Sequence, residues 1–589
     1  MVLIAQRRAR MSSLDRRTFL TTVAAGGLAS HLPVGLKAAE PAPKAPPATP
    51  PGKIDAATLE AGEKLAGISY TPEQRAKLVK GVADRAGQLP ALRAKPIPYD
   101  LPPATGFDPR LAGIVPPAGP VTRLAPHATT AASSAAPVRP VSPDDLAFLS
   151  VAELSTLLRT RQLTSRELTE LCLARLKRHD PVLQAVVTLL PDRALQQADA
   201  ADAEIRAGRW RGPLHGIPWG AKDLFAVRGY PTTWGAAQFK DRIIDDDAEV
   251  VRRLDAAGAV LVAKLSMGAL ASGDNWYGGQ TKCPWNLALG SSGSSAGSCA
   301  AVSAGLIPFA LGSETLGSIV SPCTRNGVTG LRPTYGCVSR AGAMALSWSM
   351  DKIGPIARTA EDCALIFDVL HGVDPRDPTT LDTPFAWTPT ASLKGQRIGL
   401  AKSQFDPKSE YHSANEASLE TLRRLGAELV PIELPDAPVN IIRVVLTVEA
   451  ASAFDALTLS GQLDDLIAPR PTNWASLREV RFIPAVEYVQ ANRLRTQLIR
   501  DLEQTLISAG VDVWVTPPGG TALVMTNLTG HPVVSVPSGF LPVPGGASPR
   551  RLPASLSFQA RLYRDDRALA AAHAFQQATD WHRRRPPVA

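Results

Sequence analysis

The chain has 589 residues, of which 45% are hydrophobic and 20% are charged, as expected of a globular protein. Its formal net charge is +9, but part of the excess lies in two arginine clusters, at 7–17 and 583–585. Because neither cluster is interleaved with aromatic residues, the charge does not predict nucleic-acid binding.

Residues 1–39 are expected to form an export signal. Arg16 and Arg17 stand before Phe19 and Leu20, and a mildly apolar stretch follows. This arrangement resembles a twin-arginine signal, which is an address read by a receptor. The stretch falls short of the about 20 strongly apolar residues that a stable membrane span needs. We therefore expect a periplasmic or secreted protein without a stable membrane span.

Residues 40–141 are predicted to be a linker rich in Pro and Ala with a short helical segment. Between residues 58 and 95, Leu and Val recur among charged residues with helical spacing. The residues on either side of this segment are mostly Pro, Ala, Ser and Thr, which favour irregular structure. No chemistry is assigned to this part.

The main domain, 142–589, is predicted to begin with two amphipathic helices. Ser150 with Glu153, and Thr164 with Glu167, have the spacing of capping boxes. Beyond them, short apolar runs that are typical of buried strands alternate with helical stretches, which predicts an α/β fold with helices covering a mixed central sheet. The runs lie at 259–263, 307–311 and 511–515, and the helical stretches include 247–257 and 359–371.

The six cysteines form no CxxC pair and no Cys/His cluster with zinc spacing. Their even number permits disulfides in an exported protein, but their apolar surroundings favour buried free thiols. No metal site is expected.

Three stretches of the main domain suit acyl transfer. They are GPLHGIPWGAKDLF (212–225), which contains Lys222, GSSGSSAGS (290–298) and LGSETLGSIVSP (311–322). In the third, an apolar strand is expected to enter a turn, and such a turn can direct main-chain N–H groups beside the hydroxyl of Ser318, as a nucleophile with oxyanion donors requires. Taken alone, this stretch is better explained as a tight turn.

The second stretch also contains GxSxG, at 293–297. A nucleophile elbow needs a strong strand before it, and residues 283–289 are predicted to be a loop, so we discount that match. The stretch also lacks the Lys-Ser/Thr ending of a phosphate-binding P-loop.

Read together, the three stretches resemble the amidase signature family, and the resemblance covers residues 142–580. It extends through NGVTGLRPTYGCVSRAG (326–342), SMDKIGPIARTAEDCALIFDVL (349–370) and TNLTGHPVVSVPSGF (526–540). The resemblance implies that Ser318 is the nucleophile, that Ser294 is a bridging serine after a cis peptide bond, and that Lys222 is the base. It also implies an amidohydrolase of the amidase signature fold.

The chemistry requires a neutral lysine. Lys222 can accept the proton of Ser318, through Ser294, only if its pKa lies well below the ordinary value of about 10.4. The apolar neighbours of Lys222 in the sequence predict such a shift by desolvation. The oxyanion would be held by the main-chain N–H groups of Thr315, Leu316, Gly317 and Ser318.

Three positions depart from the family pattern. Leu316 replaces the first of two glycines before the nucleophile, where a positive φ would suit a bulky side chain poorly. Val320 replaces an arginine, so a cationic support must be missing or supplied elsewhere. Glu314 replaces an aspartate. These changes put rate and substrate in doubt more than reaction type.

We expect a hydrolase that cuts a linear amide of a small molecule, without cofactor, metal or nucleic acid, and leave a homodimer open. The first alternative is the glutamine-hydrolysing subunit of a tRNA amidotransferase, which shares the family. The second is a non-catalytic binding protein on the same scaffold.

Overall fold

The computed structural model describes residues 52–67, 138–463, 485–541 and 552–587, with scattered positions at 71–83, 108 and 465–483. The predicted export signal therefore lies outside the described residues. Within the predicted linker, α2 (Ala56–Ala66) is capped by the side chain of Asp55 and ends at Gly67 in the left-handed conformation. Among the described helices, none is long and apolar enough to span a membrane.

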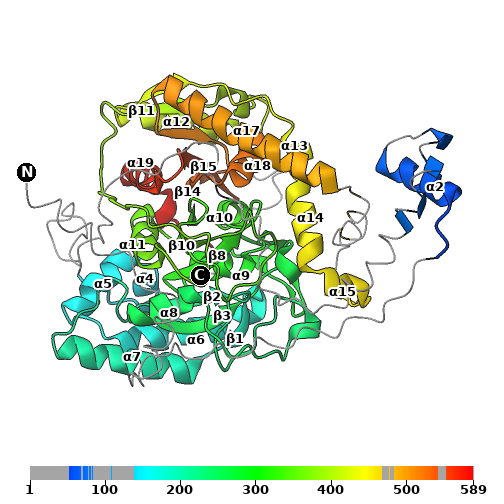
Figure 1. Ribbon diagram of the computed structural model, residues 1–589. Helices are drawn as coiled ribbons and strands as arrows, with labels where there is room; N and C mark the ends of the chain where they lie inside the picture. The colour runs from blue at the N-terminus through cyan, green and yellow to red at the C-terminus, as the bar shows by residue number, and fades with distance from the viewer. Residues whose placement is uncertain are drawn as a thin grey trace, which may run out of the picture. The chain divides into compact units, whose positions relative to one another are not determined.

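An eleven-stranded mixed sheet runs through the main body (Figure 1), which confirms the predicted α/β class. The strand order is β1-β3-β2-β8-β10-β9-β14-β15-β13-β11-β12. The pairs β2–β3, β2–β8, β11–β12 and β11–β13 are parallel and the others are antiparallel. The strands are β1 (Val186–Leu189), β2 (Pro218–Lys222), β3 (Val260–Leu265), β8 (Phe309–Glu314), β9 (Thr329–Arg332), β10 (Lys352–Ala357), β11 (Arg397–Leu400), β12 (Glu428–Pro431), β13 (Val513–Thr516), β14 (Val533–Phe540) and β15 (Pro553–Ala560).

The central strands are built mainly of apolar and small residues, as their burial requires, although β2, β3 and β10 each contain one buried lysine, Lys222, Lys264 and Lys352. Every residue of β2, β3 and β10 is buried. The predicted runs at 259–263, 307–311 and 511–515 correspond to β3, β8 and β13, with starts one or two residues later. The structure corrects the prediction for residues 283–289, which come before the second stretch, GSSGSSAGS (290–298), called the Gly/Ser loop below. The expected loop at 283–289 holds a two-stranded ladder of β6 (Lys282–Cys283) and β7 (Asn286–Gly290), separate from the main sheet, as are β4 (Asn275–Trp276) and β5 (Gly279–Gln280).

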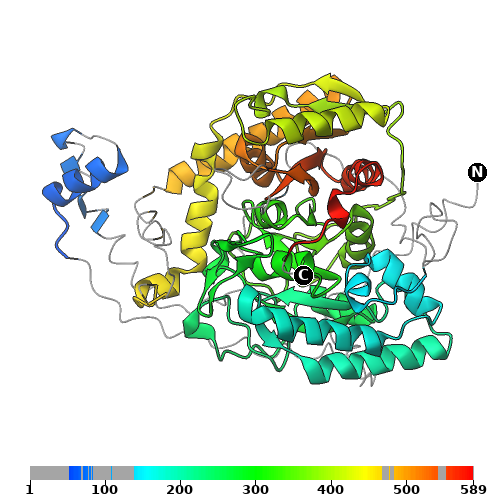
Figure 2. The same cartoon turned by 180° about the vertical axis from the view of Figure 1, so that it is seen from behind.

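Helices cover both faces of the sheet (Figures 1 and 2). A Cβ added to Gly330 of β9 would meet Cys323 of α10, whereas Phe558 of β15 packs on Phe575 of α19 from the other face. The helices of the body are α4 (Pro143–Ala147), α5 (Val151–Arg159), α6 (Ser165–Leu183), α7 (Pro191–Arg206), α8 (Glu249–Ala256), α9 (Ala296–Ser303), α10 (Val320–Asn326), α11 (Ala360–Leu370), α12 (His412–Arg424), α13 (Val439–Ile442), α14 (Val444–Ala453), α15 (Asp455–Leu459), α17 (Ala485–Ala509), α18 (Gly520–Thr529) and α19 (Asp565–Gln577).

The two predicted capping boxes are confirmed. Ser150 Oγ accepts from the Glu153 N–H at 3.1 Å, and the Glu153 carboxylate accepts from the Ser150 N–H at 2.8 Å. Thr164 and Glu167 make the same reciprocal bonds at 3.1 and 2.9 Å at the start of α6.

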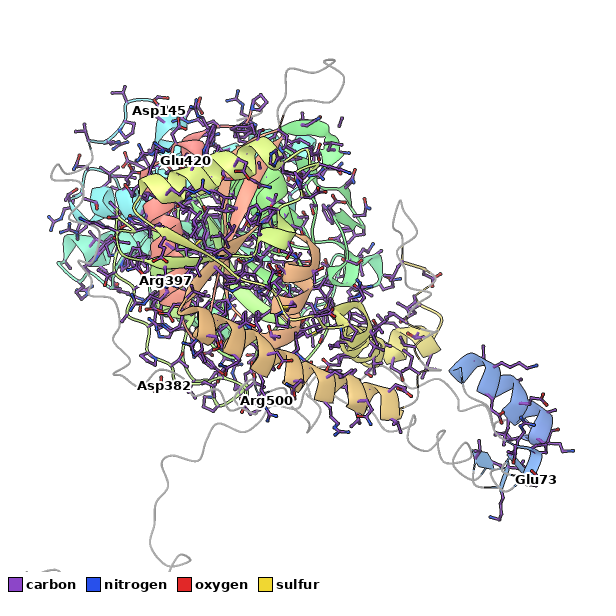
Figure 3. The ribbon with its side chains drawn as sticks, turned by 90° about the horizontal axis from the view of Figure 1, so that it is seen from above. Glu73, Asp145, Asp382, Arg397, Glu420 and Arg500 are labelled. Atoms are coloured by element: carbon purple, nitrogen blue, oxygen red, sulfur yellow. The ribbon has the colours of Figure 1, made fainter. Side chains whose placement is uncertain are left out.

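At the other end of the body, α12 and α17 carry the exposed residues Glu420 and Arg500 (Figure 3).

All six cysteines are buried free thiols, as the sequence favoured. Cys299 of α9 and Cys323 of α10 lie with their sulfur atoms 3.7 Å apart. These two helices follow the Gly/Ser loop and the Ser318 turn directly, so their packing fixes the two loops relative to each other.

Candidate active site

Lys222 lies at the carboxyl end of β2, with no exposed side-chain surface. Its amine donates to Ser294 Oγ at 2.8 Å, to Ser313 Oγ at 2.9 Å and to Ser295 Oγ at 3.1 Å. A fourth neighbour, the Ser313 carbonyl oxygen, lies at 3.3 Å. Among the described residues, no carboxylate forms an ion pair with this amine. Lys222 is therefore surrounded by uncharged hydroxyl groups.

This environment favours the neutral form of the amine. Burial lowers the pKa of Lys222 from 10.5 to about 7, while Cys299 and the carboxylates of Asp351 and Glu314 oppose part of that shift. At neutral pH a large share of the molecules can then carry an amine with a free lone pair. That is the state in which Lys222 accepts a proton.

The loop that carries Ser294 is held in an unusual backbone conformation. The Gly293–Ser294 peptide bond is cis, as the resemblance implied. A Cβ on Gly293 would lie 1.9 Å from the Gly273 carbonyl oxygen, so only glycine fits there. Ser294 is 1% exposed. The following N–H, from Ser295, donates to the Ser318 carbonyl oxygen at 3.2 Å and joins this loop to the Ser318 turn.

The Ser318 turn connects β8 to α10. Ser318 is 8% exposed, more than Lys222 or Ser294, so it is the most accessible of the three groups. Within the described chain, the main-chain N–H groups of residues 315–318 donate to no other group. These donors are therefore not used within the described chain, as the predicted oxyanion hole requires.

The departures from the family pattern are accommodated by the backbone and by distant residues. The residue with positive φ is Gly317, at 84°, and Leu316 does not adopt this conformation. Leu316 is therefore compatible with the turn, contrary to the concern raised by its size. Its side chain is half-buried.

Glu314, the last residue of β8, holds the end of the Ser318 turn through hydrogen bonds to its side chain. Its Oε2 accepts the N–H groups of Ile319 and Val320 at 2.8 and 2.9 Å. Its Oε1 receives the guanidinium of Arg332 at 2.9 Å and the amide of Asn527 at 2.7 Å. Burial alone would raise the pKa of Glu314, but Arg332 and these hydrogen bonds outweigh it and lower the pKa to about 2. Arg332 thus supplies a cation near the turn, where Val320 does not.

The structure brings together residues that sequence reasoning did not single out. Ser295 and Ser313 contact the amine directly, and both lie within the quoted stretches, but the sequence did not indicate which serines point toward Lys222. Arg332 and Asn527 reach Glu314 from β9 and α18, and nothing in the sequence near 314 indicates them.

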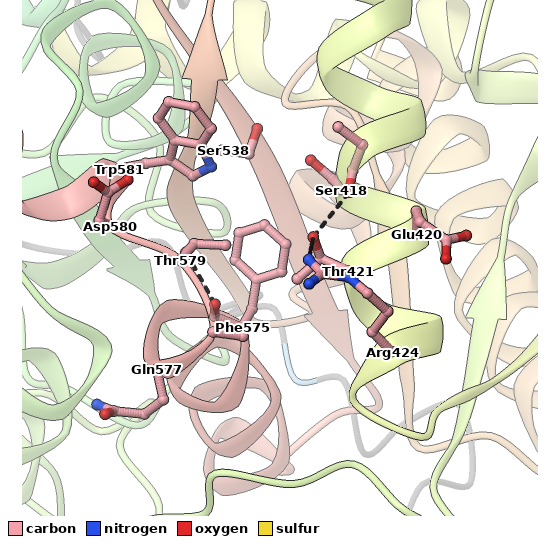
Figure 4. A pocket seen from close by; sticks show the side chains of 12 residues that line it. Ser418, Glu420, Thr421, Arg424, Ser538, Phe575, Gln577, Thr579, Asp580 and Trp581 are labelled. Atoms are coloured by element: carbon pink, nitrogen blue, oxygen red, sulfur yellow. Dashed lines mark hydrogen bonds between the residues drawn. The ribbon is translucent and has the colours of Figure 1, made fainter.

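A hollow of about 700 Å³ lies elsewhere, between α12 and the C-terminal part of the body (Figure 4). It is lined in part by Ser418, Phe575 and Trp581, and it includes none of the three candidate catalytic groups. Among the described residues, no cluster of side chains could hold a metal ion.

Comparisons with known proteins identify the family of this chain. The Amidase family model matches residues 167–569, so the chain belongs to the amidase family. Among curated relatives, the A subunit of glutamyl-tRNA(Gln) amidotransferase from Azoarcus sp. (strain BH72) is 37% identical over 490 residues, which cover 74% of this chain and 99% of the relative. The corresponding protein of Methylococcus capsulatus is 35% identical, and the match covers 74% of this chain and 98% of that relative.

Solved structures with the same fold include amidases. Native peptide amidase from Stenotrophomonas maltophilia has a TM-score of 0.67 and 31% identity, and the match covers 74% of this chain and 98% of that one. A bacterial aryl acylamidase of the amidase signature family has a TM-score of 0.65 and 25% identity, with 74% and 97% covered.

Proposed function

We propose that this chain hydrolyses the carbon–nitrogen bond of a carboxylic amide through an acyl-enzyme on Ser318. One observation carries the proposal: a buried lysine amine, with a pKa near neutrality, lies 2.8 Å from the hydroxyl of Ser294. An amine in that state can take a proton from a serine hydroxyl, which is a poor nucleophile unaided.

The proton and electron pairs then move as follows. Ser318 Oγ–H gives its proton to Ser294 Oγ, whose own proton passes to the neutral Lys222 amine. Ser318 Oγ adds to the carbonyl carbon, and the N–H groups of residues 315–318 hold the oxyanion. The C–N bond breaks as the proton returns from Lys222, through Ser294, to the leaving nitrogen. Water then releases the carboxylic acid by the same relay.

The amide donor distinguishes two forms of this function. The curated relatives favour the amidotransferase alternative over a free-standing exported amide hydrolase, because they are named as the A subunit of that enzyme and are matched over nearly their whole length. The peptide amidase and aryl acylamidase structures support the hydrolase. Glutamine is therefore the first substrate to test, followed by peptide amides and aryl anilides.

The test measures ammonia or amine release by the purified chain from glutamine, a C-terminal peptide amide and an aryl anilide, with Ser318→Ala as the control. Release that Ser318→Ala abolishes supports catalysis. Glutamine-specific release would favour the amidotransferase form, and release from the other amides alone would favour the hydrolase. If no substrate reacts and a fluorophosphonate probe fails to label folded protein, the non-catalytic alternative replaces the proposal.

We also propose that residues 1–39 direct export to the periplasm or beyond. The support is the Arg16–Arg17 pair followed by a mildly apolar stretch. A tRNA amidotransferase would have to remain in the cytoplasm with its tRNA, so a fractionation blot of the full chain separates the two forms. Recovery in the cytoplasmic fraction alone would contradict export.

A further inference from the structure

The Ser318 turn between β8 and α10 (315–319) is called the oxyanion turn below. It begins at Thr315, whose hydroxyl contacts Asp351, the residue before β10. In the β8–β10 pairing, Lys352 lies opposite Glu314, so the preceding residue, Asp351, comes beside Thr315. The Thr315 hydroxyl donates a short hydrogen bond to Asp351 Oδ1. The first residue of the turn is thus tied to a carboxylate outside the turn.

The same carboxylate closes a second loop. Asp351 Oδ2 accepts the N–H groups of Leu346 and Ser347 at 2.8 and 3.0 Å. Burial raises the pKa of Asp351, and the hydrogen bonds from Thr315, Leu346 and Ser347 oppose that rise. With both oxygens engaged, Asp351 has a fixed position from which to hold Thr315.

Glu449 of α14 fixes that second loop in turn. Its carboxylate accepts Ser347 Oγ at 2.6 Å, Ser349 Oγ at 2.7 Å and the Ser349 N–H at 2.9 Å. The Tyr488 hydroxyl of α17 donates to the same group at 2.9 Å. Ser347 therefore bonds to both carboxylates, and the contacts run without a break from α14 and α17 to the oxyanion turn.

We propose that Asp351 is a positioning residue, which sets the geometry of the oxyanion turn through Thr315 and is itself held through Ser347 by Glu449. This inference rests on the proposed acyl transfer at Ser318. The physical reason is that an oxyanion donor acts only when it is aimed at the place where charge develops. A displaced donor would lower transition-state binding more than substrate binding.

The decisive variant is Thr315→Val, which removes the hydroxyl and keeps the shape of the side chain. It should lower kcat by about 10- to 100-fold, below the loss of a whole oxyanion donor, and change KM less than about threefold. Thr315→Ser keeps the hydroxyl and should restore kcat to within about threefold of the wild-type value. Asp351→Asn and Glu449→Gln should also lower kcat, as Thr315→Val does.

Thr315→Val combined with Asp351→Asn should be no slower than the slower single variant, because the two groups act as one unit. Thr334→Val is the matched control. Its hydroxyl donates to the Asp565 carboxylate at 2.7 Å, outside the site, so this variant should lose thermal stability and keep kcat.

An unchanged kcat in Thr315→Val, an effect on KM alone, or multiplicative losses in the double variant would overturn the inference. If Asp351→Asn does not fold, the Thr315→Val and Thr315→Ser pair still decides. An inactive wild-type chain that no fluorophosphonate labels would instead reject the proposed function, so the two failures are distinguishable.

Discussion

Lowering the pH should remove activity by charging Lys222. With a pKa of about 7, rather than the ordinary 10.5, the neutral fraction at pH 8 is about 90% instead of about 0.3%. The shift is therefore worth about 300-fold in reactive enzyme at that pH. Because the neutral amine is the base, kcat/KM should fall about tenfold for each pH unit below 7.

The assay is the second-order rate of fluorophosphonate labelling between pH 5 and 10, at fixed ionic strength, which reports the free enzyme. Circular dichroism at each pH confirms that the chain stays folded. A limb centred near pH 7 is the expected result. A limb near pH 10 would refute the lowered pKa of Lys222, and a rate independent of pH throughout this range would refute the claim that Lys222 is the base.

Three further predictions concern the groups around Lys222. The pKa of Lys222 is lower in the folded state than in the unfolded state, so protonation of Lys222 opposes folding. This lowers the free energy of unfolding by about 5 kcal/mol below pH 7. The loss disappears as the pH rises from 7 to 10.5. Lys222→Met should therefore be inactive but more stable, by about 1–3 kcal/mol at pH 7 after the loss of its hydroxyl partners, with a gain that shrinks toward pH 10 in urea unfolding. Glu314→Gln leaves Arg332 buried without its anion and should lower the free energy of unfolding by about 3–5 kcal/mol; a loss under about 1 kcal/mol would show that the pair is not buried as described. Gly293→Ala should abolish fluorophosphonate labelling, because its Cβ would lie 1.9 Å from the carbonyl oxygen of Gly273. Gly62→Ala in α2, with open space around the new Cβ, is the control and should keep the wild-type labelling rate. Full labelling of the Gly293→Ala variant would contradict the described loop.

Local sequence patterns predicted much of the fold. The capping boxes at Ser150 and Thr164 need only residues three apart, and the apolar runs that became β3, β8 and β13 are buried on both faces. The ladder at 282–290 escaped prediction because β6 has only two residues and β7 has no fully buried residue, so neither strand carries a buried apolar run. Periodicity in the sequence also gives no strand order, so the antiparallel placement of β1 beside β3 was not foreseen.

The candidate site likewise contains residues that the sequence identified and partners that it did not. Lys222, Ser294 and Ser318 were identified because each lies in a distinctive stretch. The partners of Glu314, which holds the turn before α10, come from other parts of the chain: Arg332 reaches Glu314 across 18 residues and Asn527 across 213. Contacts of this kind depend on the register of the sheet, which no local pattern encodes.

The central claim is that Ser318 attacks and that Ser294 and Lys222 relay its proton. It is tested most directly by peptide mass mapping of the fluorophosphonate adduct in the wild-type chain, Ser294→Ala and Lys222→Met. The account predicts that the adduct lies on Ser318, and that it forms far more slowly in both variants. An adduct on Ser294, or labelling of Ser318 at the wild-type rate without the lysine, would contradict it.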